Sequence, residues 1–379
     1  MVGEGGIKIG RVFGIPIFLH ASWFIAFALI TLSLTQYYNS EHPQWNQTQH
    51  WMAGILTSIL FFGSVVFHEL AHSLTARAYR IPVVSITLFV FGGLARIGKE
   101  SENWRQEFNI AIAGPVSSYV LAAGFFGLGR IFPESELIGA LCGWLAQINF
   151  WLATFNLIPG FPLDGGRILR SLVWAATGDY TRATKVASLG GQGVAYLMIF
   201  WGIWQAVKGE WANGLWMAFV GWFLLSAAQE TFAQVAIRSA LRGMRAGDVM
   251  TREVPTISRA ISLEDYVQEI VRTGRRVHLV EGDGRVVGLI SVHVLNKIPR
   301  EEWTSTSVQA AMIPRDSIHA TRPDEPILAI LERMQAEDIN QMPVVARVDG
   351  AERVVGLISR DNILRVIQTR LEMSALAEQ

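Results

Sequence analysis

The sequence predicts a polytopic α-helical membrane protein with about six transmembrane helices and short β-strands at the cytoplasmic rim, followed by a soluble α/β tandem domain. Three observations lead to this fold class: the distribution of charge, a series of long apolar runs and an internal repeat. Residues 1–236 carry 25 of the 64 charged side chains and 12 of the 13 tryptophans, whereas residues 237–379 carry the other 39 charged residues. The first part lacks the charge that a water-facing surface needs, and the second has an ordinary globular composition.

Six apolar runs reach the roughly 20 residues that a bilayer core about 30 Å thick requires. They lie near residues 17–37, 51–79, 107–131, 137–158, 184–207 and 212–237. Basic residues gather in alternate loops, which by the positive-inside rule places both termini in the cytoplasm. The first residues do not form a short apolar stretch ending in a cleavage site, so we expect the N-terminus to be retained. The expected location is a prokaryotic cell membrane, crossed several times.

Between the second and third runs, residues 81–98 predict one or two strands. Their β-branched and aromatic residues favour a pleated backbone, and Pro82 and a Gly-Gly pair would disrupt a helix. Irregular backbone at membrane depth must be covered by protein or face water. We therefore place these strands at the cytoplasmic rim.

Overall charge and cysteine content exclude two classes of protein. The formal net charge is zero and like charges do not form long runs, so the electrostatic footprint of a nucleic-acid-binding protein is missing. The single cysteine, Cys142, lies in an apolar run and cannot build a disulfide framework.

The second apolar run contains an HExxH pattern formed by His68, Glu69 and His72. On an α-helix, histidines four residues apart lie on one face, so both can reach one Zn²⁺ with Glu69 beside them as general base. Ionisable groups inside a spanning helix are costly, so they need partners or a polar cavity. Alternatively, the histidines make interhelical hydrogen bonds and Glu69 snorkels. Glu69 is about ten residues, roughly 15 Å, from the cytoplasmic end of its helix, which is too far to snorkel easily.

The best third ligand is Asp164, at the cytoplasmic end of the fourth run and on the same membrane side as His68. Prolines and glycines around it free the backbone from helix, so the carboxylate can turn inward while Arg167 and Arg170 stay with the lipid head groups. Alternatively, Asp164 only caps the next helix. Together with the HExxH pattern at matching depth, metal ligation is favoured.

These motifs resemble those of the site-2 proteases, peptidase family M50, which are intramembrane zinc metalloproteases. The resemblance covers roughly residues 10–235 and rests on the HExxH of residues 68–72 and on Asn156 followed by Leu163-Asp164-Gly165. It implies one Zn²⁺ per chain, bound by the two histidines and the aspartate, with Glu69 as catalytic base. It also implies that Asn156 positions or stabilises the reacting group. In the stretch AGPVSS, residues 113–118, we expect only close packing and a kink.

The resemblance implies an endopeptidase that hydrolyses peptide bonds of transmembrane proteins near the cytoplasmic face. Its expected substrate is a membrane-tethered regulator such as an anti-sigma factor. A helical substrate must unwind before it is cut, and an exposed strand edge in residues 81–98 could hold the unwound segment by strand addition.

Two further features of the membrane part have a structural interpretation. His20 is either satisfied by a neighbour in its own helix, which we favour, or lines the cavity. The small residues Gly190, Gly191 and Gly193 indicate close approach of helices rather than a nucleotide-binding loop.

The soluble part is an internal duplication. The segment RVVGLIS around Gly288 recurs around Gly356, and each copy alternates short strands with a helix, at 262–273 or 325–336. The pattern resembles a pair of CBS domains over roughly residues 245–370. Such pairs bind adenine nucleotides, ATP or AMP, and the ribose-binding aspartate is matched by Asp361, whereas the first copy has His293 there. The alternative is that the pair only forms a homodimer or packs against the membrane part.

We therefore expect a membrane-embedded zinc metalloprotease domain at residues 1–240 and CBS repeats at 245–300 and 306–370, which regulate it through a nucleotide. The expected partners are the lipid bilayer and a membrane-spanning protein substrate. The alternative function is a transporter or channel gated by the CBS pair, in which the intramembrane His, Glu and Asp form an ion path. A membrane scaffold with a purely stabilising metal is a third possibility.

Overall fold

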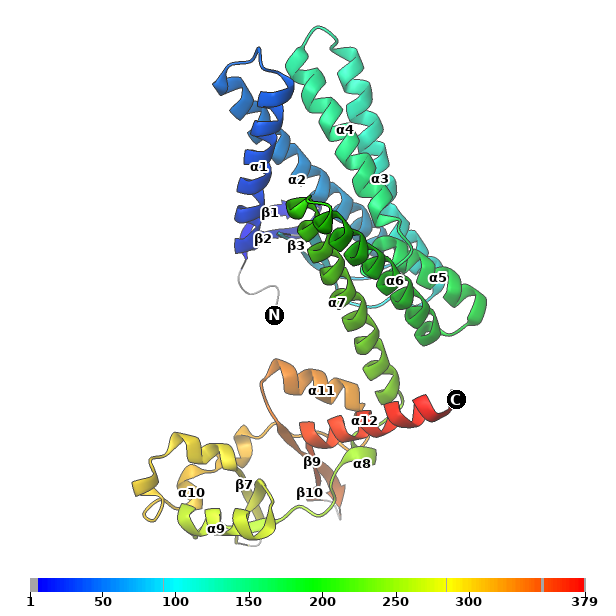
Figure 1. Ribbon diagram of the computed structural model, residues 1–379. Helices are drawn as coiled ribbons and strands as arrows, with labels where there is room; N and C mark the ends of the chain where they lie inside the picture. Colours follow the sequence, from blue (N-terminus) through cyan, green and yellow to red (C-terminus); the bar gives the residue numbers. More distant parts are fainter. Residues whose placement is uncertain (1–5, 91, 284, 349–350, 378–379) are drawn as a thin grey trace. The chain divides into compact units, whose positions relative to one another are not determined.

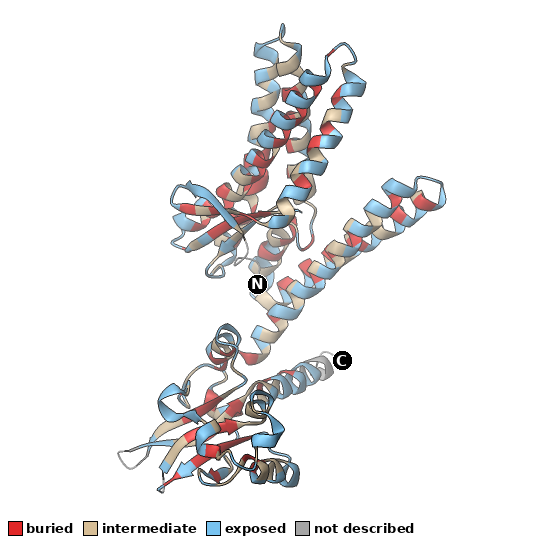
Figure 2. Ribbon diagram, turned by 90° about the vertical axis from the view of Figure 1, so that its left-hand side faces the viewer, coloured by how far each residue is buried: buried red, intermediate tan, exposed pale blue. Residues whose placement is uncertain are grey.

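The computed structural model describes residues 6–90, 92–283, 285–348 and 351–377. The chain folds into two compact units, Met1–Val235 and Ala236–Gln379. Figure 2 shows that, within each unit, buried residues line the faces on which helices and strands meet.

The first unit is built mainly from long helices. In the helical bundle, α1 packs on α2, α2 on α3 and α3 on α4, so that these four helices lie side by side (Figure 1). The short helix α5 packs on α3 and α6. The helices are α1 (Ala21–Glu41), α2 (Gln47–Ala78), α3 (Trp104–Ile131), α4 (Glu136–Asn156), α5 (Asp164–Thr177), α6 (Tyr180–Val207) and α7 (Trp211–Leu241).

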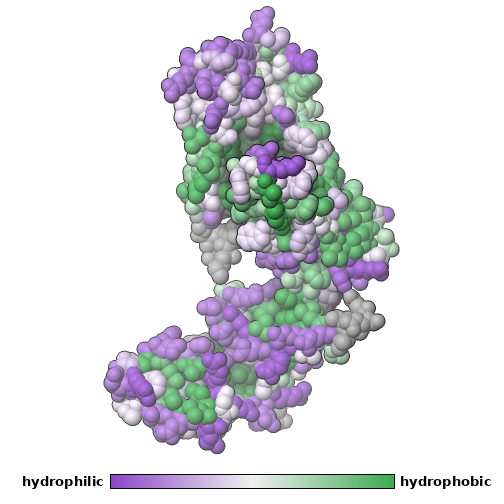
Figure 3. Space-filling view, viewed as in Figure 1, coloured by the Kyte–Doolittle hydropathy of each residue, from purple (hydrophilic) through white to green (hydrophobic). Residues whose placement is uncertain are grey.

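Among the described residues, five helices are long and apolar enough to cross a membrane: α2, α3, α4, α6 and α7. Their outer faces expose large apolar side chains, with 70% of Leu197 and 64% of Trp211 accessible. Figure 3 shows this apolar surface over the helices, with polar residues at the end formed by the α1–α2 and α3–α4 loops. An apolar surface of this extent is typical of a lipid-facing protein.

The first predicted span is different in the structure. Residues 15–19 form a strand, helix α1 begins only at Ala21, and α1 is not one of the five helices. His20 caps α1, because its Nδ1 accepts a hydrogen bond from the Ser22 backbone amide at 3.2 Å. This histidine is therefore satisfied locally, as favoured from the sequence.

A four-stranded sheet has the order β1 (Ile7–Val12), β2 (Ile15–Leu19), β3 (Val83–Phe89), β4 (Gly92–Ile97). The two strands predicted within residues 81–98 are confirmed as the antiparallel hairpin β3–β4. The β1–β2 hairpin was not predicted. Its two-residue turn places Phe13 and Gly14 at positive φ, 49° and 78°, and a phenylalanine gives no sequence signal for that conformation.

The sheet packs directly against the helix that carries the HExxH pattern. Ile15 of β2, Leu70 of α2 and Ile86 of β3 form one buried cluster, and β4 also contacts α2. The strand β4 lies at an edge of the sheet. This packing places the edge strand β4 next to the C-terminal half of α2, which carries Glu69.

Glycines let α6 approach its neighbours closely, but not always another helix. A Cβ on Gly191 would lie 2.8 Å from the Phe161 backbone nitrogen, and a Cβ on Gly190 would lie 2.6 Å from the Pro159 carbonyl oxygen. The predicted close approach is confirmed at these two positions, although the neighbour is the loop before α5. It is wrong for Gly193, where a Cβ would find no atom of the described residues within 4 Å.

The second unit contains two similar α/β copies. The first has β5 (Thr256–Ser258), α9 (Leu263–Thr273), β6 (Val277–Gly282) and β7 (Arg285–Ser291). The second has β8 (Ile313–Pro314), α11 (Ile327–Ala336), β9 (Gln341–Val348) and β10 (Ala351–Ser359), and α12 (Arg360–Ala377) follows. The short helix α8 (Ala246–Val249) precedes the first copy, and the short helix α10 (Val308–Ala311) precedes the second. The two helices predicted in the repeat are confirmed as α9 and α11.

The two copies exchange short segments reciprocally. Ile313 pairs with Leu289 of the first copy, and Thr251 pairs with Leu357 of the second. At Gly288 and at Gly356, a Cβ would lie 2.6 Å from the sulfur of Met312 and of Met250, respectively. The glycine of the repeated GLIS segment therefore leaves room for a methionine in both copies.

Candidate metal centre

Two buried imidazoles lie one helical turn apart on α2. His68 and His72 are 5% and 4% exposed, and their Nε2 atoms are 3.2 Å apart. The i, i+4 spacing places both on one face of the helix, as the HExxH pattern predicts.

Asp164, the first residue of α5, meets both rings. Its Oδ2 lies 3.0 Å from His68 Nε2 and 3.1 Å from His72 Nε2. The turn into α5 depends on Gly165 and Gly166, because a side chain at either would overlap the backbone of residues 157–161. These glycines let α5 begin close to the end of α4, which directs the carboxylate inward.

Contacts from α3 fix the orientation of the two rings. The Ile110 carbonyl oxygen lies 2.6 Å from His72 Nδ1. Since a carbonyl only accepts, this nitrogen carries a proton, and in the neutral ring the Nε2 lone pair of His72 faces Asp164. The Ser118 hydroxyl lies 2.9 Å from His68 Nδ1.

The three converging atoms fit a divalent cation. His68 Nε2, His72 Nε2 and Asp164 Oδ2 are ligand atoms of the types that zinc binds, and a cation between them would replace the protons that these contacts otherwise need. A tetrahedral Zn²⁺ with ligand bonds of about 2.0–2.1 Å has neighbouring ligand atoms about 3.3 Å apart. The observed separations of 3.0, 3.1 and 3.2 Å are close to that value. His68, His72 and Asp164 are also the described residues that group as a candidate metal site.

Gly114 of α3 forms one wall of the centre. A Cβ there would lie 2.6 Å from His68 Nε2 and closer still to His72 Nε2. The expected close packing in the AGPVSS stretch is therefore confirmed, but the contacts of Gly114 and Ser118 with the imidazoles were not predicted. A signal was available, since Ile110, Gly114 and Ser118 are spaced by four residues and share one face of α3.

Glu69 lies between α2 and the edge strand β4. Its carboxylate accepts a hydrogen bond from the Ala95 backbone amide, and a Cβ on Gly93 would lie 3.2 Å from its Oε1. The absence of a side chain at Gly93 leaves room for the carboxylate. Glu69 is therefore held beside the edge strand β4 as well as beside the two histidines.

Asn156, the last residue of α4, is partly buried. Its side-chain amide donates a hydrogen bond to the Leu152 carbonyl, one turn earlier, at 2.9 Å. Within the described part of the chain, its hydrogen bonds do not include one to His68, His72 or Asp164.

The prediction that Arg167 and Arg170 stay with the head groups is wrong. Arg170 is only 9% exposed, and both guanidinium groups bind the buried carboxylate of Glu107, at 3.0 Å from Arg167 Nε and 2.5 Å from Arg170 Nη2. The sequence alone did not indicate a role for Glu107. Arg167 and Arg170 reach Glu107 because α5 packs against α3.

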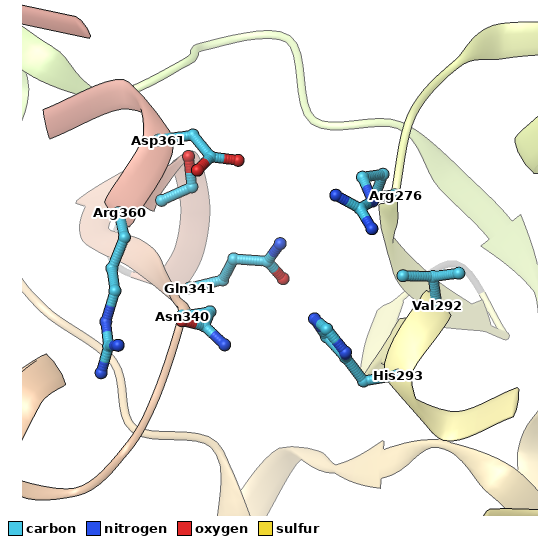
Figure 4. Close-up of a pocket in the computed structure, with 8 residues that line it drawn as sticks. Arg276, Val292, His293, Asn340, Gln341, Arg360 and Asp361 are labelled. Atoms are coloured by element: carbon cyan, nitrogen blue, oxygen red, sulfur yellow. The ribbon is translucent and has the colours of Figure 1, made fainter. Parts of the chain in front are cut away.

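Asp361 lines a pocket of about 210 Å³ between the two copies of the second unit. Figure 4 shows Asp361 on one side and His293 and Arg276 on the other, with Gln341 pointing into the space between them and Arg360 turned away. The aspartate of the second copy and the histidine at the matching place in the first thus face one pocket. Asp361 also lines a second pocket of about 210 Å³ that includes Val254, Pro255 and Val277.

Comparisons with known proteins agree with the two units. Residues 56–140 and 130–200 match peptidase family M50, and residues 246–297 and 310–369 match the CBS domain. Two relatives described as candidate zinc metalloproteases align along almost the whole chain. One is sll0528 of Synechocystis sp., 33% identical over 97% of this chain and 96% of its own. The other is Rip3 of Mycobacterium tuberculosis, 32% identical over 95% and 92%.

A solved structure of a site-2 protease from Methanocaldococcus jannaschii is 30% identical and covers 60% of this chain and 95% of its own, with a TM-score of 0.43. The fold, the buried cluster and the two relatives define a membrane zinc metalloprotease with a C-terminal CBS domain pair. The chain belongs to peptidase family M50. It is therefore an enzyme, and not the transporter or channel considered from the sequence.

Proposed function

We propose that the protein is an intramembrane zinc endopeptidase that cuts membrane-spanning proteins near the cytoplasmic face. The observation that carries this proposal is the convergence of His68 Nε2, His72 Nε2 and Asp164 Oδ2 within 3.2 Å of one another. Glu69 lies beside this cluster on the same helix. Three protein ligands and a neighbouring carboxylate are the components of a hydrolytic zinc site.

In this proposal His68, His72 and Asp164 hold one zinc ion per chain. When bound, zinc polarises the scissile carbonyl and lowers the pKa of water. Glu69 accepts the proton of the attacking water and returns it to the leaving amine. The Ala95 amide holds the Glu69 carboxylate on the side of the edge strand, so the proton-transfer group lies next to the place where a substrate strand would add.

Asn156 positions or stabilises the reacting group in this proposal. It ends α4, eight residues before Asp164 in the chain. In the reaction, the Asn156 amide gives up its hydrogen bond to the Leu152 carbonyl. It then donates to the scissile carbonyl oxygen of the substrate, which gains negative charge.

The unwound substrate adds to β4. Support comes from the position of this strand at an edge of the sheet and from its contact with α2. Strand addition replaces helical hydrogen bonds that the substrate loses on unwinding. Proline substitutions along β4 should abolish cleavage, and the same substitutions along β1, the opposite edge, should not. Unchanged cleavage by the β4 series would exclude this binding mode.

Both chain termini lie in the cytoplasm in this proposal. Helix α1 also crosses the membrane, which gives six crossings together with α2, α3, α4, α6 and α7. Helix α1 has 21 residues and is therefore about 32 Å long, enough for a core of about 30 Å. The positive-inside rule supports this arrangement, and cysteine labelling of loop positions in whole cells tests it.

The CBS pair, at residues 245–300 and 306–370, regulates the membrane-embedded domain, residues 1–240, by binding ATP or AMP, with Asp361 holding the ribose. The pocket between the copies supports this part of the proposal, because Arg276 and His293 face it opposite Asp361 (Figure 4). Titration of the full-length protein with each nucleotide tests it, with Asp361→Ala as the matched variant. Equal binding by the variant would contradict the role of Asp361.

The experiment that tests the catalytic proposal combines metal analysis with a cleavage assay on membrane-tethered regulators such as anti-sigma factors. Wild-type protein should contain one zinc per chain and cut a substrate. The Glu69→Gln variant should retain zinc and lose cleavage. Zinc-free active protein, or an active Glu69→Gln variant, would contradict the mechanism.

A further inference from the structure

An ion cluster buried beside the metal centre joins α3 to α5. The Glu107 residue is 2% exposed, and its Oε1 accepts hydrogen bonds from Arg167 Nε at 3.0 Å and from Arg170 Nη2 at 2.5 Å. A carboxylate buried to this extent must be paired, and two charge-assisted bonds satisfy that need.

Aromatic rings hold one of the two arginines in place. The Arg170 guanidinium carbon lies 5.0 Å from the ring centre of Phe161 and 4.8 Å from that of Tyr180. Both distances are within the range of a cation–π contact. The arginine is therefore fixed between the loop before α5 and the start of α6.

The helix that these bonds hold also carries a metal-site residue. Asp164 begins α5, and Arg167 follows it by three residues, about one turn. The buried residues of α5 are Gly165, Gly166, Arg170 and Ser171. Among the apolar residues of α5, Leu169 packs against Phe161 and Ala187, so the ion cluster adds a charged contact to α3 to the apolar packing of this helix.

The α3 side of the ion cluster also lies close to the metal centre. Glu107 lies three residues before Ile110 on α3, and the Ile110 carbonyl orients His72. Gly114 and Ser118, further along the same face, contact the imidazoles. The Glu107 cluster thus joins the helix that orients the histidines to the helix that carries Asp164.

We infer that Glu107 is a positioning residue, which through Arg167 and Arg170 sets the place of the Asp164 carboxylate relative to His68 and His72 and thereby the affinity for zinc. This inference rests on the proposed zinc site. Metal–ligand distances tolerate only about 0.2 Å of error, so a small shift of α5 along α3 is enough to weaken binding.

The test measures the zinc dissociation constant of purified full-length protein by competition with a chelator. The Glu107→Gln variant keeps the size of the side chain but removes its charge. It should bind zinc about 10–100-fold more weakly, the loss typical of groups that orient metal ligands. The matched control is Glu102→Gln, which removes an exposed carboxylate that binds Lys99 at 2.5 Å, and its zinc affinity should be unchanged.

A double-mutant cycle separates positioning from general stability. If Glu107 acts through Asp164, the loss of zinc affinity caused by Glu107→Gln should be several-fold smaller in the Asp164→Asn background than in the wild type. An equal loss in both backgrounds would overturn the inference. If Glu107→Gln does not fold, the cycle is run with Arg167→Lys, and the same two outcomes apply.

The inference and the proposed function fail in different ways. Wild-type protein without zinc affinity would contradict the zinc site itself. Wild-type protein that binds zinc, with Glu107→Gln binding equally well, would leave the zinc site intact and overturn the positioning role.

Discussion

Replacing Gly114 with alanine should weaken zinc binding strongly without unfolding the protein. The added Cβ would lie 2.6 Å from His68 Nε2. An ordinary contact is at least 3.4 Å, so this nitrogen must move by about 0.8 Å, and His72 Nε2 by more. The movement is about four times the 0.2 Å that metal–ligand distances tolerate. Disturbed orientation of metal ligands costs about 10–100-fold in metal affinity, equivalent to about 1.4–2.8 kcal/mol.

The same substitution should not weaken α3 as a helix. Alanine is more favourable than glycine inside a helix by about 0.5–1 kcal/mol. The matched controls are Gly124→Ala and Gly127→Ala in the same helix, where an added Cβ would find no atom of the described residues within 4 Å. All three variants should unfold near the wild-type temperature in detergent, and only Gly114→Ala should bind zinc more weakly.

The assay is chelator competition on purified full-length protein, with zinc content after dialysis as a second readout. A Gly114→Ala variant that binds zinc as tightly as wild type would refute the geometry, because the two Nε2 atoms could not then face a metal across this position. Weaker binding in Gly124→Ala or Gly127→Ala as well would show that the effect is not specific to the centre.

Three other predictions concern the site and the second unit. Ser118→Ala should weaken zinc binding about 10–100-fold by removing the partner of His68 Nδ1, and wild-type affinity would exclude this role. EDTA should abolish cleavage and added zinc should restore it; activity that survives complete zinc removal would contradict a metal-dependent reaction. Burial lowers the pKa of His278. The nearby charge of Glu269 raises this pKa by less, and the charge of Arg275 lowers it further. Protons therefore favour the unfolded state, and stability should fall as pH drops below about 6.5. Hydrogen exchange of β6 should show this loss in wild type and less of it in His278→Phe; equal pH dependence would refute it.

The sequence predicts best what depends on helical periodicity and length. Five of the six apolar runs are long apolar helices, and His68 and His72 share one face of α2 because the spacing of four residues fixes this. The position of Asp164 also follows, since few acidic residues exist at that depth. These features rest on local rules that hold whatever the tertiary contacts are.

What the sequence did not reveal depends on tertiary contacts. The arginines of α5 looked like head-group ligands because their partner, Glu107, lies 60 residues before Arg167 in the chain. The β1–β2 hairpin was hidden because Ile15–Leu19 is apolar and runs into α1, and its pairing with β1 and β3 is what makes it a strand. Gly114 looked like a packing residue until the imidazoles were placed against it.

The most direct test of the account is zinc X-ray absorption of the purified full-length protein. Two imidazole nitrogens and a carboxylate oxygen, at distances of about 2.0–2.2 Å, are the protein ligands that His68, His72 and Asp164 would give. The His72→Ala variant should lose one imidazole from this shell or lose the metal. A shell containing sulfur from Cys142, a shell unchanged in His72→Ala, or protein that takes up no zinc would contradict the account.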